Sequence, residues 1–228
     1  INICAAVECI HSYSLIHDDL PCMDNDTIRR GKPSTHIKFG EASAVLAGSS
    51  LLTLAFEIIA DKKYLINSKI KNEIIKSLAS CSGHTGIAGG QELDLKFENK
   101  KKKLKQIIDM QKKKTGKLFN FCLLAVAAIA KKNYKEKKFF SNLGEEIGLL
   151  FQFADDFLDN TGSRKLVGKP VKKDQKKGKS TILNLMGENK AYLYANNLKK
   201  KILRKLKKHG KKAEDLTNTI EFILERKF

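Results

Sequence analysis

Aspartates crowd into one short stretch near the beginning of the chain. Residues 17–33 read HDDLPCMDNDTIRRGKP, with four aspartates in the nine positions 18–26 and then Arg29 and Arg30. Carboxylates this close together repel one another unless a positive charge lies between them. Guanidinium groups, in turn, form paired hydrogen bonds with phosphate oxygens. This stretch therefore predicts a site for a divalent cation with a phosphate group beside it.

A second acidic stretch, FQFADDFLD at 151–159, supplies the other half of such a site. Asp155 and Asp159 are four residues apart and share one face of a helix, with Asp156 beside them. Oxygen ligands without histidine or cysteine favour Mg²⁺, which keeps water ligands and is completed by substrate phosphates. We expect the two stretches to face each other across a cavity, with metal and diphosphate between them. In the alternative interpretation, the acids only end one helix and decorate another.

The elements that must position these residues are helices. Apolar periodicity and glycine or proline breaks delimit them, the chain has only three prolines, and no alternation typical of β-strands stands out. The sequence predicts an all-α bundle in a single domain. The expected helices cover 1–20, 41–60, 66–84, a helix that starts within 86–95, 101–130 and 134–161, followed by two or three shorter ones with a break at Gly210; the expected loops are 21–40 and 163–180.

The chain is strongly basic, with a formal net charge of +19. Nearly all of this charge is lysine spread over several segments, which favours solvated helix faces over a nucleic-acid-binding surface, so we expect no nucleic-acid partner. No uninterrupted apolar run reaches the roughly 18 to 20 residues of a membrane span, so we expect no stable membrane insertion. The five cysteines form no CxxC pair, which fits free thiols in a reducing, cytoplasmic setting.

Together these motifs resemble those of the trans-isoprenyl diphosphate synthases, with the bacterial farnesyl and geranyl diphosphate synthases as the nearest branch. DDLPCMDND followed by RRGKP, and DDFLD much later, carry the resemblance, which continues through HIKFGEASAVLAG, GGQELD, KTGKLF, GKPVKKD and GKST. The resemblance implies a helical bundle of the isoprenoid synthase type with a central cavity. The family's GKxxRP segment and its first helices are not among residues 1–228, so we expect this domain to lack its natural N-terminal part.

The resemblance implies a Mg²⁺-dependent prenyl transfer. An allylic diphosphate of five or ten carbons ionises, isopentenyl diphosphate attacks the resulting cation, and a proton is lost to give a short-chain product, in the first place farnesyl diphosphate. Three Mg²⁺ ions per active site are implied, with Mn²⁺ able to replace them. The implied metal ligands are Asp18, Asp19, Asp24, Asp155 and Asp159.

Further roles follow from the same resemblance. Arg29 would contact the allylic diphosphate and Arg30 the isopentenyl diphosphate, and a homodimer is expected. The other implied site residues are Lys114, Lys169 and Lys179 on the allylic diphosphate, Thr115 and Gln152 facing the cation, and Gln91 and Asp94 lining the same cavity.

Tyr13 is the implied determinant of product length. It precedes Asp18 by five residues, which is about 7.5 Å along a helix axis. The resemblance implies an apolar tunnel beside this helix, into which the product grows, so the ring would form the tunnel floor and keep the product short. The competing interpretation is an ordinary core tyrosine.

Two positions depart from the family pattern, and three other functions compete with it. Asn25 and Ser49 stand where relatives carry aspartate.

A class I terpene cyclase shares the fold, but it usually carries a different second metal motif and many aromatic residues, whereas tryptophan is absent here. A basic nucleic-acid-binding or scaffold protein and a non-catalytic partner subunit are the remaining competing functions.

Overall fold

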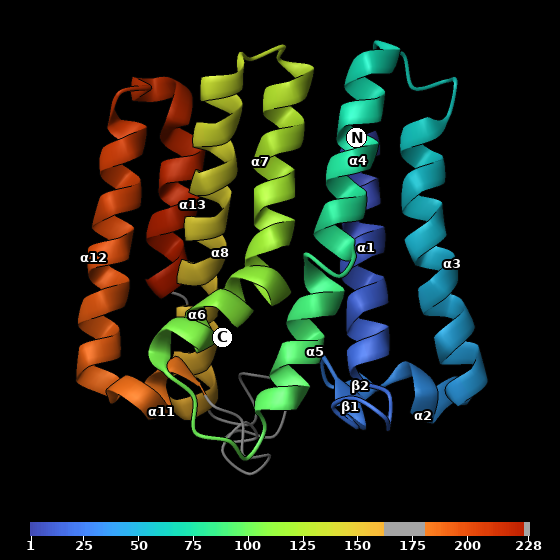
Figure 1. Ribbon diagram of the computed structural model, residues 1–228, viewed down its shortest axis with the longest axis vertical. Coiled ribbons are helices and arrows are strands. Elements are labelled where there is room, and N and C mark those ends of the chain that lie inside the picture. The colour runs from blue at the N-terminus through green and yellow to red at the C-terminus, as the bar shows by residue number, and fades with distance from the viewer. Residues whose placement is uncertain (162–180, 226–228) are drawn as a thin grey trace.

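The computed structural model describes residues 1–161 and 181–225, which form a bundle of mostly parallel and antiparallel helices (Figure 1). The expected all-α fold is confirmed. The long elements are α1 (Asn2–Asp18), α3 (Glu41–Ala60), α4 (Ser68–Ser82), α5 (Ile87–Phe97), α6 (Leu104–Gln111), α7 (Lys117–Ile129), α8 (Tyr134–Thr161), α12 (Glu188–Lys207) and α13 (Glu214–Glu225). The short ones are β1 (Ile28–Arg29), β2 (Lys32–Pro33), α2 (Thr35–Phe39), the π-helical turn η1 (Lys112–Gly116), α11 (Ile182–Met186) and the 3₁₀ turn η2 (Gly210–Ala213).

Most helix bounds agree with the sequence prediction, and two features do not. The predictions for 41–60 and 134–161 are confirmed at both ends. The single helix expected over 101–130 is wrong, because the helical segment begins at Leu104 and is interrupted by η1. The expected loop 21–40 contains the β1–β2 hairpin and α2. The loop expected over 163–180 lies outside the described residues.

Two apolar clusters hold the bundle together. One joins α1, α3, α4 and α7, with Ile10, Ile59, Leu78 and Phe121 fully buried. The other surrounds α8 and reaches α6, α11, α12 and α13. Helix α8 also packs closely against the π-helical turn η1: a methyl group on Gly148 would lie only 2.6 Å from Cα of Gly116. Glycine is therefore required at this crossing.

Helix α3 is unusually apolar for an outer helix. It is the one helix in the described part of the chain that is long and apolar enough to cross a membrane by length and composition alone, and 22% of that stretch is buried in the bundle. One face packs along α1, whereas Val45, Leu46 and Leu54 are exposed. This helix contains no long uninterrupted apolar run, because serine, threonine and glycine interrupt its apolar residues, so it did not stand out in the sequence.

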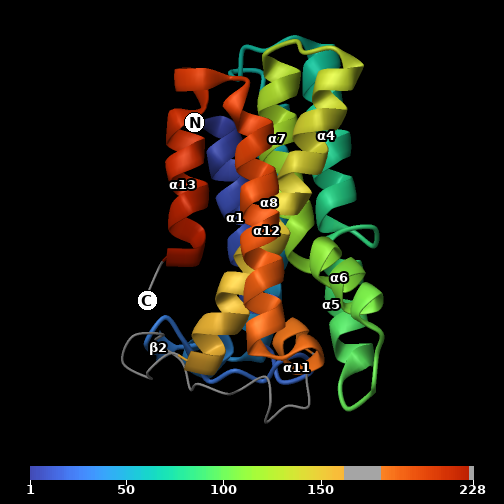
Figure 2. The ribbon, with the colours of Figure 1, turned by 90° about the vertical axis from the view of Figure 1, so that its left-hand side faces the viewer.

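The motif-bearing ends of several helices lie together. The C-terminal ends of α1 and α8, the hairpin and α5 all lie at the lower end of the bundle in Figure 1, and Figure 2 shows the same arrangement for the hairpin, α8 and α5 after a quarter turn. The fold thus brings residues more than a hundred positions apart in sequence to one end of the molecule.

Candidate active site

The first acidic stretch folds back on the end of α1. The backbone N–H of Asp24 donates to the carbonyl of Asp18 at 2.8 Å, and that of Asp26 donates to the carbonyl of Asp19 at 3.0 Å. Asn25 between them has a φ of +49°, a left-handed conformation that asparagine tolerates better than most residues. Asn25 is exposed, so its departure from the family pattern removes a charge from the rim and leaves the buried carboxylates in place.

Asp19 is buried and engaged by Arg29. Its side chain is 3% exposed, Nε of Arg29 donates to both carboxylate oxygens at 3.0 and 3.1 Å, and Nη2 of Arg29 donates to Oδ1. Coordination of a metal by Asp19 would compete with this strong paired contact. The geometry therefore favours Asp19 as the residue that orients Arg29. The half-buried Asp18 and Asp24 remain the candidate metal ligands of the first acidic stretch.

Arg30 lies beside a residue that the sequence analysis did not single out. Its Nη2 is 3.5 Å from Nε2 of His11, which lies two turns before the end of α1. Because a guanidinium only donates, Nε2 of His11 faces it as an acceptor. Burial is the main cause that lowers the pKa of His11, and the positive charges of Arg30 and Arg29 lower it further. His11 and Arg30 therefore form a contact between α1 and the hairpin, next to the pair of Arg29 and Asp19.

The backbone at Arg30 is strained in a way that points to function. Arg30 has a φ of +52° and Gly31 a φ of +75°, at the two central positions of the hairpin turn. Such turns favour Asn-Gly, and a residue with a full side chain in this conformation costs about 1–2 kcal/mol. Arginine is retained here despite that cost, which supports a role for its guanidinium.

Replacing Arg30 by asparagine is therefore expected to separate stability from function. Arg30→Asn should raise the free energy of unfolding by up to about 1 kcal/mol, measured by denaturant titration, because asparagine relieves the strain. It should also raise KM for isopentenyl diphosphate, the ligand that the resemblance implies for Arg30, by about tenfold or more, because charge-assisted hydrogen bonds are lost. Lys131→Asn is the matched control: Lys131 also has a φ of +52° but lies between α7 and α8. An unchanged KM in Arg30→Asn would exclude the binding role.

The second acidic stretch is connected to the π-helical turn. Asp155 and Asp159 are half-buried on the last turns of α8, and Asp156 is buried. Thr115 donates its hydroxyl proton to Oε1 of Gln152 at 3.1 Å, and Nε2 of Gln152 donates to Oδ1 of Asp156 at 2.9 Å. The structure thus brings Thr115 and Gln152 together across 37 positions, and the chain of hydrogen bonds fixes which way the amide points.

The π-helical turn also positions Lys114. Its Nζ forms an ion pair of 2.7 Å with Oδ2 of Asp94 on α5. Helix α5 approaches the turn closely: a methyl group on Gly90 would lie 2.2 Å from the backbone nitrogen of Lys114. π-Helical turns inside helices are frequent at functional sites. Next to this contact the buried Gln91 has no hydrogen-bond partner for either side-chain polar atom within the described residues, as expected of a group that binds water or substrate.

The carboxylates fit Mg²⁺ as a bound metal. Among the residues that the structure describes, no group of three or more His, Cys, Asp or Glu is arranged to hold a metal by itself. Mg²⁺ does not require one, because it is usually bound through one or two carboxylates, waters and substrate phosphates. The half-buried aspartates of the two acidic stretches, Asp18 and Asp24 in the first and Asp155 and Asp159 in the second, are ligands of this kind.

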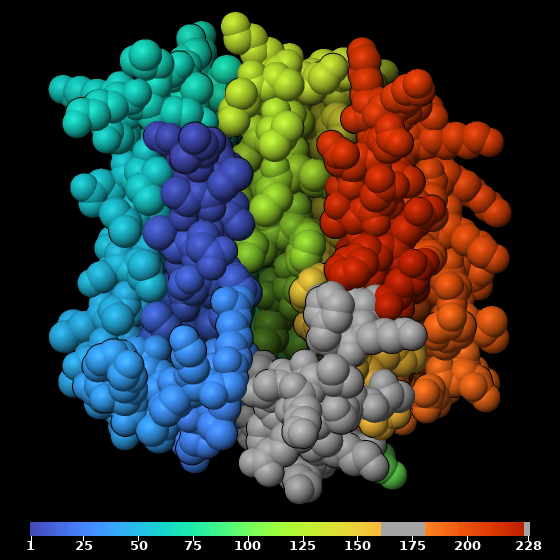
Figure 3. Space-filling model, turned by 180° about the vertical axis from the view of Figure 1, so that it is seen from behind, coloured from blue at the N-terminus to red at the C-terminus, as the bar shows by residue number. Residues whose placement is uncertain are grey.

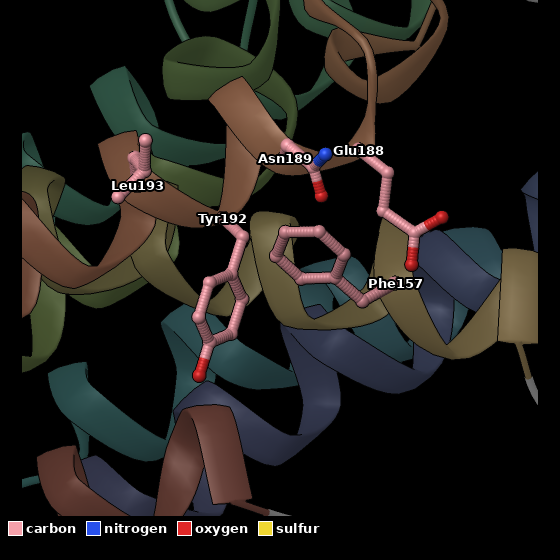
Figure 4. A pocket seen from close by; sticks show the side chains of 5 residues that line it. All are labelled: Phe157, Glu188, Asn189, Tyr192 and Leu193. Atoms are coloured by element: carbon pink, nitrogen blue, oxygen red, sulfur yellow. The ribbon is translucent and has the colours of Figure 1, made fainter.

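A hollow leads toward this end of the bundle. Figure 3 shows it from behind, between α1 and α13, with α7 along its floor. A separate cavity of about 360 Å³ lies between α8 and the start of α12 (Figure 4). None of its lining residues was predicted as a site residue, although Phe157 belongs to the second acidic stretch. They are Phe157, Glu188, Asn189, Tyr192 and Leu193.

Tyr13 lies in the apolar cluster above the first acidic stretch. It is 7% exposed, and its hydroxyl donates to the carbonyl of Ser82 on α4 at 3.3 Å. Burial, with a smaller contribution from Asp18, raises the pKa of Tyr13 to about 12, so the phenol keeps its proton and this contact at neutral pH. The ring stands edge-on to His17 with centroids 5.6 Å apart. It is therefore held firmly between α1 and α4.

The remaining predicted residues have simple placements. Lys169 and Lys179 lie outside the described residues. Ser49 is exposed on α3. Sequence reasoning missed the contact of His11 with Arg30 and the proximity of Asp26, which is 5% exposed, to Arg29. A single histidine in an apolar helix carries no recognisable sequence signal. The fourth aspartate of the first acidic stretch follows the three predicted ligands, so the sequence could have indicated that Asp26 also lies close to the site.

The ends of α1 and α8 that carry the acidic stretches, and the hairpin that carries Arg29 and Arg30, lie at one end of this all-α bundle, and their carboxylates and guanidinium groups suit Mg²⁺ and phosphate oxygens. Residues 1–223 match the family model described as Polyprenyl synthetase, and the chain belongs to this family. It is 40% identical to farnesyl diphosphate synthase of Escherichia coli, over 97% of this chain and 76% of that protein. It is 41% identical to farnesyl diphosphate synthase of Bacillus subtilis, over 82% of this chain and 63% of that protein.

Solved structures agree with this assignment. An FPP/GFPP synthase from Zymomonas mobilis superimposes with a TM-score of 0.87 at 40% identity, over 97% of this chain and 75% of that one. A geranyltransferase from Helicobacter pylori, solved with magnesium and isoprenyl diphosphate, gives a TM-score of 0.87 at 36% identity, over 98% and 73%. The isoprenoid synthase fold expected from the sequence is confirmed, and the terpene cyclase and scaffold functions find no support. The chain spans about three quarters of the Escherichia coli relative and less than two thirds of the Bacillus subtilis one.

Proposed function

We propose that the protein is a short-chain prenyltransferase that condenses isopentenyl diphosphate with an allylic diphosphate, with farnesyl diphosphate as the main product. The observation that supports the proposal is that the ends of α1 and α8 that carry the two acidic stretches, and the hairpin that carries Arg29, lie at the same end of a bundle of this family (Figure 1). Relatives at about 40% identity are farnesyl diphosphate synthases, and a geranylgeranyl pyrophosphate synthase of Arabidopsis thaliana is also 40% identical, over 88% of this chain and 54% of that protein. Product length therefore needs its own test.

The chain's own residues divide the work between binding and charge stabilisation. Arg29, oriented by Asp19, holds the allylic diphosphate, with Lys114 beside it. Mg²⁺, held by Asp18, Asp24, Asp155 and Asp159, would neutralise charge on the departing diphosphate.

The hydroxyl of Thr115 and the amide oxygen of Gln152 would face the allylic cation. Arg30 and His11 would hold the isopentenyl diphosphate. A diphosphate next to His11 favours its protonated form, which turns the ring into a second donor.

Incubation of the purified protein with isopentenyl diphosphate, geranyl diphosphate and Mg²⁺ tests the proposal, with products identified by mass spectrometry. We expect farnesyl diphosphate and release of inorganic diphosphate, both abolished by a chelator and restored by Mg²⁺ or Mn²⁺. Conversion of geranyl diphosphate to cyclic products without isopentenyl diphosphate would instead identify a cyclase.

Shortening Tyr13 is expected to lengthen the product. Tyr13→Ala should shift the products toward geranylgeranyl diphosphate and longer chains, because the ring that ends the apolar space is removed. The free energy of unfolding should fall by about 3 kcal/mol, since a large buried side chain is lost. Tyr13→Phe is the control, because it keeps the ring and loses only the hydrogen bond to Ser82. The same products from Tyr13→Ala and the parent would refute the role.

The exposed face of α3 supports a homodimer as part of the proposal. Val45, Leu46 and Leu54 are 43%, 67% and 39% exposed, and apolar patches of this kind mark protein contacts. Leu46→Lys is expected to convert the dimer to a monomer in sedimentation velocity experiments, whereas Lys76→Glu on α4 should not. A parent protein that sediments as a monomer would exclude the dimer.

All five cysteines are free thiols, which supports the further proposal of a cytoplasmic location.

A further inference from the structure

The positive charge of the chain is concentrated on α12 and the turn that follows it. Residues 188–212 contain ten of the 44 basic residues and one of the 25 acidic residues, so they contribute +9 to the formal net charge of +19. Lysines occur in several segments, but nearly half of the net charge thus comes from this one. Helix α12 lies at the edge of the bundle, at the left in Figure 1 and facing the viewer in Figure 2, and exposes this charge to the outside.

Burial divides α12 into two opposite faces. The inner face packs against α8, and its residues are apolar and buried: Ala191, Ala195, Leu198, Ile202 and Leu206. The opposite face, here called the basic face, consists of exposed residues three or four positions apart: Lys190, Leu193, Asn197, Lys200, Arg204 and Lys207. These residues form a row of about 26 Å along the helix axis.

The acidic side chains that neighbour α12 contact its sides. Three ion pairs of 2.6 to 3.3 Å join the helix to α13 and α8: Lys199–Glu225, Lys201–Glu146 and Lys205–Glu146. None of these lysines belongs to the basic face. The four cations of the basic face form no ion pair with any residue that the structure describes. Their charge is therefore presented to solvent without compensation.

The stability of the helix does not explain this arrangement. Like charges three or four positions apart, such as Lys200, Arg204 and Lys207, destabilise a helix. The helix dipole favours cations in the last turn, but it disfavours Lys190, which lies in the first. An exposed face that only keeps a protein soluble mixes charges of both signs, whereas the basic face carries one sign. The arrangement therefore indicates an anionic partner.

The residue types favour a lipid surface as that partner over a nucleic acid. Three of the four cations are lysines, whose attraction to anionic headgroups requires no fixed geometry. Leu193, at one end of the same face, is 63% exposed. An apolar side chain gains free energy when it enters the headgroup region of a bilayer, but gains little against a phosphodiester backbone. A straight row of side chains on an outer helix also fits a flat surface.

We propose that the basic face of α12 binds the surface of an anionic lipid bilayer, with its four cations at the phosphate headgroups and Leu193 inserted between them. The contact is peripheral and requires no segment that crosses the membrane. It goes beyond the proposed function and does not depend on it. For a prenyltransferase, such a contact would bring an amphiphilic product close to the lipid phase into which its hydrocarbon tail partitions.

Co-sedimentation of the purified protein with lipid vesicles tests the inference. We expect binding to vesicles of phosphatidylcholine with about 30% phosphatidylglycerol, much weaker binding to phosphatidylcholine alone, and a loss of binding as salt is added. Each cation near an anionic surface strengthens binding about fivefold. The triple variant Lys200→Gln, Arg204→Gln and Lys207→Gln should therefore raise the dissociation constant about a hundredfold. Leu193→Ser should raise it about fivefold.

The control removes the same charge from another surface. Lys62→Gln, Lys69→Gln and Lys76→Gln change exposed residues on α4 and in the loop before it, and should together raise the dissociation constant less than about threefold. Circular dichroism checks that each variant is folded. Asn197→Glu is an independent test, because it keeps every lysine and places a negative charge in the middle of the basic face. It should weaken binding about fivefold.

Four results would overturn the inference. A parent protein that does not bind the anionic vesicles, or binds neutral ones equally well, lacks the proposed contact. An equal loss in the control on α4 would show that total charge, and not the basic face, determines binding. Unchanged binding in the triple variant or in Asn197→Glu would exclude α12. Tighter binding to duplex DNA than to the vesicles, unaffected by Leu193→Ser, would identify a nucleic-acid surface instead. None of these results depends on prenyl transfer, so the proposed function is tested separately.

Discussion

Replacing either Asp18 or Asp155 by asparagine is expected to reduce kcat for prenyl transfer by about a hundredfold to a thousandfold. Asparagine has the same shape, so packing at the ends of α1 and α8 should persist, but its neutral amide is a poor ligand for a hard cation. The departing diphosphate then loses charge stabilisation at the step where charge develops. Steady-state kinetics at saturating Mg²⁺ measures the loss for each variant.

The matched control for these variants is Asp215→Asn, which removes an exposed carboxylate at the start of α13. It should leave kcat unchanged. In the proposed site the two aspartates hold metal ions on the same diphosphate, so the double variant should lose little more than the worse single variant, because groups that act as a unit are not additive. A normal kcat in Asp18→Asn or Asp155→Asn would remove that residue from the metal site.

Adding one methyl group to Gly90 is expected to disable the enzyme without touching a polar side chain. The new methyl of Gly90→Ala would lie 2.2 Å from the nitrogen and 2.5 Å from the Cα of Lys114, so backbone must move against backbone. We expect the free energy of unfolding to fall by about 1–3 kcal/mol or more. Displacement of Lys114 and Thr115 by the order of 1 Å should lower kcat by about a hundredfold.

Ala88→Ser is the comparison for Gly90→Ala, since Ala88 is exposed on the same helix. Thermal unfolding and kinetics are measured together at a temperature at which both variants are folded. Parent-like kinetics in a folded Gly90→Ala protein would show that the close approach of α5 to η1 is dispensable.

Much of the fold follows from local sequence patterns, because a helix with a long apolar stripe and clear end signals can be recognised from its own residues. Glu41–Ala60 begins after Gly40 and Tyr134–Thr161 follows a polar turn, and both bounds were predicted. The π-helical turn Lys112–Gly116 was not, because it depends on tertiary contacts. Gly90 presses on it from α5 and Gly148 from α8, and neither contact is encoded within the turn itself. The hairpin was missed because strands of two residues carry no periodicity.

The candidate site, like the fold, could be predicted from the sequence only in part. Spacing alone predicted the carboxylates that share a helix face, such as Asp155 and Asp159. The division of labour within the first stretch needed coordinates, because a loop with a left-handed residue at Asn25 decides which aspartate meets Arg29. Likewise, the proximity of His11 to Arg30 depends on how the hairpin folds back along α1.

The most direct test of the shared metal site is a crystal structure of the protein with Mg²⁺ and inorganic diphosphate. We expect one diphosphate at the lower end of the bundle, with carboxylate oxygens of Asp18 and Asp155 about 2.0–2.1 Å from Mg²⁺ ions that share it. Arg29 should meet the same diphosphate while still paired with Asp19. A diphosphate bound elsewhere, or Mg²⁺ ions that engage only one of the two acidic stretches, would contradict the shared site on which the proposed chemistry depends.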